Sequence, residues 1–248
     1  MPHQAQGLRR LFSSRGTRVV SVLAGPTAAD EGEFVQALAN RLSREDGRPV
    51  WLVDAVAGRI ADRLGCRPLL PWRADLPLSR QVIRAGACGL IYAPGVLAGD
   101  AALARAAGDS RACGFLLFDG GRFTTTGAPL DRFTPQTLVA LLGKRDAEAG
   151  YALAKALAAT PSPSRLLFLG ETADRAAQAA RHFLNQAAEG CQARAEVCQI
   201  DNRRPETSSN TLTIEPNLTW VVSRIMQNDQ PKVAHGGCSN SAEEVYQR

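Results

Sequence analysis

The chain has 248 residues, of which 45% are hydrophobic, and a formal net charge of +5. A chain of this length can bury one sizeable core, so we expect one α/β domain with short appendages. It contains no run close to the ~18 apolar residues of a membrane span and no apolar signal-peptide core, and its six cysteines lack the C-x-x-C spacing of zinc sites. These features predict a cytoplasmic protein with no metal site.

The first 16 residues are predicted to form a helix and a basic arm that docks on a partner. Ala5, Leu8 and Phe12 fall on one helical face, and the first 18 residues hold four arginines and no acid. A basic amphipathic helix outside the body is a docking element. The alternative is a helix that folds back on its own domain.

The next segment has the order of a phosphate-binding loop. An apolar run at 18–24 ends in Ala-Gly, and a helix follows that begins near Asp30 and Glu31. A working loop needs a lysine for the phosphates and a Ser or Thr for Mg²⁺. The lysine positions are instead Pro26 and Glu31, and the Ser/Thr position is Gly32. The sequence therefore predicts the scaffold of a nucleotide site without its chemistry.

Short apolar runs continue along the chain and alternate with helical patterns. Beyond 18–24, we expect strands at 49–54, 89–93, 114–119, 164–169 and 195–200. We expect helices at 31–45, 56–64, 77–85, 98–107, 134–159 with a break near Gly143, and 172–189. Near-continuous apolar strands separated by helices predict a doubly wound, mostly parallel sheet.

From residue 201 the composition shifts to Asn, Ser, Thr, Gln and Pro. We expect 201–248 to be a largely disordered, mobile tail, in which only Leu218 to Met226 could pack, as an edge strand or a short helix. The expected domains are thus the arm at 1–16, the α/β body at 17–200 and the tail.

Several motifs together resemble one family. Residues 3–10 read H-Q-A-Q-G-L-R-R and resemble the D-Q-A-x-G-L-R signature of the FlhG/FleN flagellar-number regulators, with His3 in place of the acid. Those regulators are MinD/ParA-type deviant Walker ATPases, whose loop G-K-G-G-V-G-K-T aligns with residues 25–32. The segments 50–55, 89–95 and 115–119 resemble the family's next strand, its G-L-x-I-x-P-A-G stretch and its Walker B strand. The resemblance covers roughly residues 3–190.

The resemblance implies a MinD-like P-loop NTPase fold. In the family, the first loop lysine reaches across an ATP-sandwiched dimer and the second binds phosphate, whereas Pro26 lacks the charge and Glu31 inverts it. The implied degenerate nucleotide site consists of Gly25, Pro26, Asp30, Glu31, Gly32, Asp54 and Asp119. We expect Asp54 and Asp119 to serve as turn and cap residues. We expect no cofactor, with ATP and Mg²⁺ bound only if the loop retains some affinity, and a monomer rather than an ATP-dependent dimer.

The family's N-terminal motif activates an SRP-type GTPase, FlhF, by presenting a helix to it. The resemblance implies that the partner-binding residues here are Gln4, Ala5, Leu8, Arg9 and Arg10. The leading function is therefore a regulatory pseudo-ATPase similar to FlhG/FleN, controlling flagellar number or placement, with recruitment to the cell pole by its partner. No catalytic residue is expected.

Two other functions remain open. One is an active MinD/ParA-like ATPase switch, which the loop residues disfavour. The other is a nucleic-acid or secretion-linked adaptor on an α/β scaffold. Arg175, Arg181 and Arg194 are interspersed with acids, so no concentrated basic patch for nucleic acid is expected. Direct membrane contact is not expected either, because 172–189 is charge-balanced and 218–226 is short.

Overall fold

The computed structural model describes ten segments of the chain: residues 16–28, 31–56, 58–66, 70–95, 103, 113–123, 137–158, 165–186, 194–198 and 214–227. The expected N-terminal helix, most of the helix expected at 98–107, Asp30 and much of the expected tail lie outside these segments.

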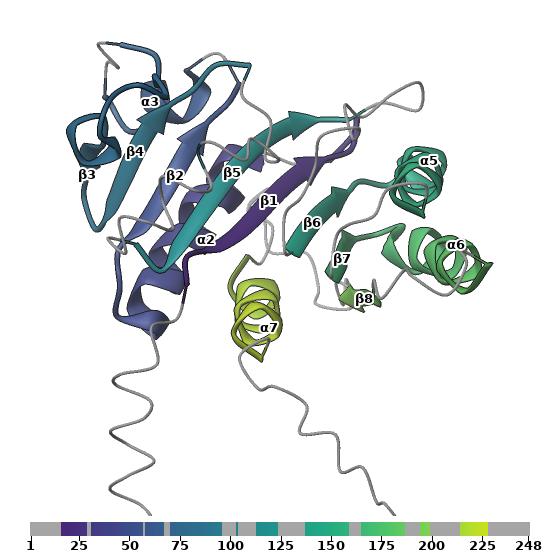
Figure 1. The fold of residues 1–248 in the computed structure, drawn as a ribbon. Coiled ribbons are helices and arrows are strands. Elements are labelled where there is room, and N and C mark those ends of the chain that lie inside the picture. The colour runs from purple at the N-terminus through teal and green to yellow at the C-terminus, as the bar shows by residue number, and fades with distance from the viewer. Residues whose placement is uncertain are drawn as a thin grey trace, which may run out of the picture.

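The described residues form one eight-stranded sheet with the order β3-β4-β2-β5-β1-β6-β7-β8 (Figure 1). The strands are β1 (Arg18–Ala24), β2 (Val50–Asp54), β3 (Ile83–Ala85), β4 (Cys88–Tyr92), β5 (Phe115–Arg122), β6 (Thr137–Leu142), β7 (Arg165–Gly170) and β8 (Arg194–Cys198). All neighbours are parallel except β3 and β4. The predicted doubly wound, mostly parallel sheet is confirmed.

Helices cover both faces of this sheet (Figure 1). They are α2 (Glu31–Asp46), α3 (Arg59–Arg63), α5 (Ala147–Ala158), α6 (Ala173–Gln186), α7 (Ile214–Met226) and the 3₁₀ turn η1 (Leu78–Arg80). The helices α2, α3 and α7 share one core cluster with the sheet, and α5 and α6 share the other. No helix within the described segments is both long and apolar enough to span a membrane.

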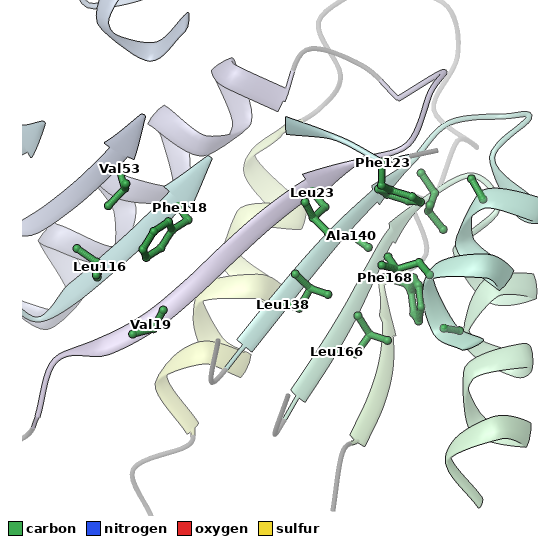
Figure 2. Packing of buried hydrophobic residues seen from close by; sticks show 14 of the residues in the cluster. Val19, Leu23, Val53, Leu116, Phe118, Phe123, Leu138, Ala140, Leu166 and Phe168 are labelled. Carbon is green, nitrogen blue, oxygen red and sulfur yellow. The ribbon is translucent and has the colours of Figure 1, made fainter. Parts of the chain in front are cut away.

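The strands supply both clusters because successive side chains point to opposite faces. In β1, Val20 and Val22 pack toward α2 and α7, whereas Val19 and Leu23 belong to the cluster with α5 and α6. Figure 2 shows this second layer, in which the β1 residues share one cluster with side chains of β5, β6 and β7: Leu116, Phe118, Leu138, Ala140, Leu166 and Phe168. A strand buried on both faces reads as the continuous apolar run seen in the sequence.

The buried cysteines are part of this core. Cys88 and Cys113 are free thiols, and burial raises the pKa of the Cys113 thiol to about 11. Burial also raises the pKa of Cys88. Both behave as small apolar side chains.

The prediction of a helix at 77–85 is wrong. After Pro77 the chain makes only the single turn of η1, and residues 83–85 form β3, antiparallel to β4. Ala85 pairs with Cys88 across a tight connection that contains Gly86, which has a φ of +61°. Because glycine adopts this left-handed conformation without steric cost, the segment forms a hairpin instead of the predicted helix.

The prediction of a helix at 134–159 is also wrong for its first part. Residues 137–142 form β6, parallel to both β1 and β7, and the helix α5 begins only at Ala147. A short continuous apolar run fits a buried strand and a buried helix equally well by periodicity. The expected break near Gly143 marks the end of the strand.

The helix α7 adds a piece of the expected tail to the core. Its residues Leu218, Val221, Val222 and Ile225 are buried on the face that α2 covers. The Arg165 guanidinium donates to the backbone carbonyl of Arg224 in the last turn, where cations favour the helix dipole. The packed body therefore extends beyond residue 200.

We predict that Ile225→Ala destabilises the whole domain, because it truncates a side chain that is 2% exposed in the core cluster shared by α2, α3, α7 and the sheet. The free energy of unfolding should fall by about 2–5 kcal/mol, measured by chemical denaturation. The control is Ser223→Ala on the exposed face of the same helix, which should change stability little. Equal stability of the two variants would show that α7 is not part of the cooperative unit.

Candidate functional site at the carboxyl edge of the sheet

The loop after β1 lies where the order of the sheet reverses. The strand β1 has β5 on one side and β6 on the other, and residues 25–28 leave its carboxyl end toward α2. In open α/β sheets, ligands bind at this topological switch point. The position of the loop is therefore that of a binding site.

The backbone N–H groups of residues 25–28 are all engaged within the protein. Gly25 donates to the carbonyl of Leu141 at 2.8 Å, and Ala28 donates to the carbonyl of Gly25 at 3.2 Å. Thr27 donates to the Asp146 carboxylate at 3.0 Å, and Pro26 has no N–H. A phosphate loop binds its ligand through such N–H groups. In this four-residue stretch, none of them points to a ligand site.

Asp146 fixes the loop from the side of β6. Its carboxylate, on a side chain buried in the turn before α5, accepts the Thr27 hydroxyl at 2.8 Å and the Gly143 N–H at 2.8 Å. A Cβ atom on Gly25 would lie 2.2 Å from the Asp146 Oδ2 atom. Glycine is therefore required at position 25 for the close approach of Asp146.

The loop carbonyls converge on Arg122. Its Nη1 donates to the carbonyls of Gly25 at 3.1 Å and Pro26 at 2.8 Å, and its Nη2 donates to that of Ala28 at 3.2 Å. The pairing of β1 with β5 shifts register just before Arg122, at Gly121, which has a φ of +72°. Such a bulge redirects the side chain that follows it. The loop thus presents oxygens to a cation, the reverse of the polarity that binds phosphate.

Glu31, at the predicted lysine position, sits between two arginines. Its side chain is 1% exposed, its Oε1 accepts from Arg59 Nη1, and its Oε2 lies 3.2 Å from Arg122 Nη2. A carboxylate buried this deeply must be paired, and both of its oxygens are. Glu31 therefore joins the start of α2 to α3 and to the end of β5.

Arg59 binds a second carboxylate, that of Asp119. Its Nη2 is 2.5 Å from Asp119 Oδ1, and its Nε is 3.3 Å from Oδ2, a bidentate pair. Although burial lowers the pKa of Arg59, the hydrogen bonds and charges of Asp119 and then Glu31 raise it above the ordinary value overall. Asp119 also accepts the Gly121 N–H at 3.3 Å, a turn contact at the bulge.

Asp54 lies beside Asp119 on the neighbouring strand. It is fully buried, and its Oδ2 accepts the Ala61 N–H at 2.9 Å in the first turns of α3. Its Oδ1 is buried without a hydrogen-bond partner. Burial and, to a smaller extent, the Asp119 charge raise the pKa of Asp54, and the Ala61 N–H opposes them. Burial and the neighbouring Asp119 charge favour the neutral carboxyl group, whereas the Ala61 N–H favours the carboxylate.

The structure brings together five of the residues singled out from the sequence and places a sixth in the first turn of α2. These are Gly25, Pro26, Glu31, Asp54 and Asp119 at the edge, and the buried Gly32. Asp30 and the N-terminal residues Gln4, Ala5, Leu8, Arg9 and Arg10 lie outside the described segments. Among the described residues, no group of His, Cys, Asp and Glu has the arrangement of a metal site.

Sequence reasoning missed Arg59, Arg122 and Asp146. The Gly120-Gly121 pair before Arg122 forms the bulge that directs this arginine across the loop. Arg59 and Asp146 follow short loops and carry no motif of their own.

We predict that Asp54→Asn stabilises the protein near neutral pH. Because the folded pKa of Asp54 is raised above its value in the unfolded chain, its contribution is fully present below the unfolded pKa and is lost as pH rises through the folded pKa. Because the amide of asparagine does not ionise, the variant does not lose this stability as the pH rises. The Tm should therefore exceed that of the wild type at pH 7 by about 2–4 °C per kcal/mol gained, and the difference should vanish near pH 4.

The control for this titration is Asp62→Asn, which removes an exposed carboxylate from the same short helix α3. It should not reproduce the pH-dependent gain. A Tm for Asp54→Asn below that of the wild type by the same amount at every pH would contradict a raised pKa of Asp54.

No protein-family model and no curated protein sequence matches this chain. Solved structures do match its fold. The cobyrinic acid a,c-diamide synthase from Mycobacterium smegmatis, with bound ATP analog and magnesium, is 15% identical over 86% of this chain and 95% of its own, with a TM-score of 0.51. The MinD cell division protein from Aquifex aeolicus is 9% identical over 87% of this chain and 99% of its own, also with a TM-score of 0.51. Together with the sheet order and the loop after β1, these likenesses show that the chain has the fold of MinD-type P-loop ATPases.

Proposed function

We propose that this chain is a regulatory pseudo-ATPase similar to the FlhG/FleN regulators, in which the MinD-like body serves as a scaffold and the N-terminal arm acts on a partner. The proposal that the body is a pseudo-ATPase rests on residues 25–28, whose carbonyl groups face a cation. Their N–H groups bond to protein acceptors, while three carbonyls bind the Arg122 guanidinium.

Charge at the lysine position supports the loss of nucleotide binding. A phosphate at the loop would face the Glu31 carboxylate instead of an ammonium group. Two unit charges about 4 Å apart interact by roughly 4 kcal/mol at an effective dielectric constant of 20, so loss of the ammonium group removes an attraction of that order. The arginines paired with Glu31 offset part of the repulsion from its carboxylate.

The residues that would hold magnesium are also otherwise engaged. Asp119 forms a bidentate pair with Arg59, and Asp54 caps α3 with one oxygen. These contacts support the proposal that the chain lacks the equivalent of the ATP analog and magnesium bound by the cobyrinic acid a,c-diamide synthase.

The second half of the proposal is that the arm docks on an SRP-type GTPase of the flagellar system, FlhF-like, and so controls flagellar number or placement. It is supported by the resemblance of residues 3–10 to the activating motif, with Gln4 at its glutamine and Leu8 and Arg9 at its anchors. A glutamine orients water in GTPase chemistry. The polar link from Ser13 to Gly16 would let the helix reach outward.

We predict that the wild-type protein does not bind MgATP in the micromolar range, measured by isothermal titration. The triple variant Pro26→Lys/Glu31→Lys/Gly32→Thr should recover measurable affinity, because it restores both cations and the hydroxyl ligand. No single substitution should suffice. A micromolar Kd for the wild type would instead support an active MinD/ParA-like switch, and salt-dependent binding of duplex DNA would support the adaptor.

We predict that a synthetic peptide of residues 1–18 stimulates GTP hydrolysis by the cognate SRP-type GTPase. Gln4→Ala should remove most of the stimulation while leaving binding nearly intact, because it changes a contact to the reacting groups. Arg9→Glu should weaken binding itself, because it reverses an anchoring charge. The matched control is Gln6→Ala, which lies at the variable position of the motif. A peptide that neither binds nor stimulates would remove the flagellar assignment.

A further inference from the structure

One carboxylate group is held from two sides by guanidinium groups. Arg59 Nη1 contacts Oε1 of Glu31, and Arg122 Nη2 lies 3.2 Å from Oε2. Charge-assisted hydrogen bonds from arginine are the means by which proteins hold phosphate and carboxylate ligands. The two arginines therefore form a receptor for an oxyanion, and the Glu31 carboxylate occupies it.

Each arginine is also held by contacts that do not involve Glu31. Arg59 forms its bidentate pair with Asp119, and Arg122 donates to the carbonyls of Gly25, Pro26 and Ala28. Removal of the Glu31 side chain therefore leaves both guanidinium groups anchored. A receptor whose donors are preorganised in this way binds without first ordering them.

The two arginines reach solvent, whereas the carboxylate between them does not. The side chains of Arg59 and Arg122 are 32% and 43% exposed, whereas that of Glu31 is 1% exposed behind them. Glu31 is also the first residue of α2, a helix of 16 residues, whose N-terminus favours negative charge at the same place. Once the Glu31 side chain is removed, an anion from solution would meet the exposed parts of both arginines beside the first turn of α2.

We propose that Arg59, Arg122 and the first turn of α2 form an oxyanion-binding site that the chain fills with its own Glu31 carboxylate, and that this site takes inorganic phosphate once the carboxylate is removed. In the wild type, Glu31 is an internal ligand that holds α2, α3 and the end of β5 together. The inference deepens the proposed pseudo-ATPase function, since it names what occupies the former ligand position. The arrangement of these elements then requires no nucleotide.

The test measures phosphate binding by the full-length Glu31→Ala variant at constant ionic strength, with chloride as the reference anion. The variant should melt below the wild type in chloride, and inorganic phosphate should raise its Tm progressively. Its affinity for phosphate should exceed that of the wild type by about tenfold or more, which titration calorimetry resolves. The wild type should show no such response, because Glu31 occupies the site.

Two double variants assign the binding to the receptor. Glu31→Ala/Arg122→Ala should lose the phosphate response, whereas Glu31→Ala/Lys144→Ala should keep it, because Lys144 is a highly exposed cation on the same edge of the sheet. Equal phosphate affinity in the wild type and Glu31→Ala would overturn the proposal. Binding that survives the loss of Arg122 would overturn it too.

If Glu31→Ala does not fold in chloride, the same measurements are made on Glu31→Ser, whose small polar side chain suits the first turn of a helix. If neither variant folds in chloride, phosphate-dependent refolding followed by circular dichroism supports the site, and no refolding overturns it. The result is independent of the MgATP titration of the wild type, because it is measured on Glu31 variants with phosphate alone.

Discussion

The Glu31 carboxylate between Arg59 and Arg122 is the interaction on which this edge of the molecule depends. A buried charge is tolerated only when it is paired, and removal of one partner from such a pair costs about 3–5 kcal/mol. Glu31 therefore requires cations at the carboxyl edge of the sheet. Both come from other elements, one from the start of α3 and one from the end of β5.

The geometry of the loop follows from that requirement. The bulge at Gly121 directs Arg122 across residues 25–28, and the loop turns its carbonyls toward the guanidinium group. The Thr27 N–H then takes the Asp146 carboxylate as its acceptor. The acid Glu31 on α2 is thus accompanied by loop carbonyls that face Arg122 and by a bulge at the end of β5. Asp146, in the turn before α5, accepts the loop N–H group.

The sequence predicts most of the sheet because its strands are buried on both faces and appear as apolar runs. It misassigns 137–142, where six residues between β1 and β7 have the same composition as a buried helix. It identifies Leu218 to Met226 as a segment that could pack, as an edge strand or a short helix, and the structure makes it part of α7, with four core positions: Leu218, Val221, Val222 and Ile225. The strand-end acids Asp54 and Asp119 are found from the sequence, since they follow apolar runs directly.

The arginines could not be found in the same way. Arg59 and Arg122 lie far from Glu31 in the chain, and no spacing rule relates an inverted charge to the cations that compensate it. Only the fold brings α2, α3 and β5 to one edge. Local patterns identify the acid at position 31, whereas the cations that pair with it are a tertiary property.

The core of this MinD-type fold and the charged edge at the loop after β1 are built from separate sets of residues. The two apolar clusters depend on alternating side chains in the strands and on the helices that cover them, and neither cluster includes Glu31, Arg59 or Arg122. Function resides in the residues placed on a fold rather than in the fold itself. Because the charges at the edge are satisfied by one another, the scaffold does not need a ligand there to complete it. This independence is what the proposed role of the α/β body as a support for the N-terminal arm requires.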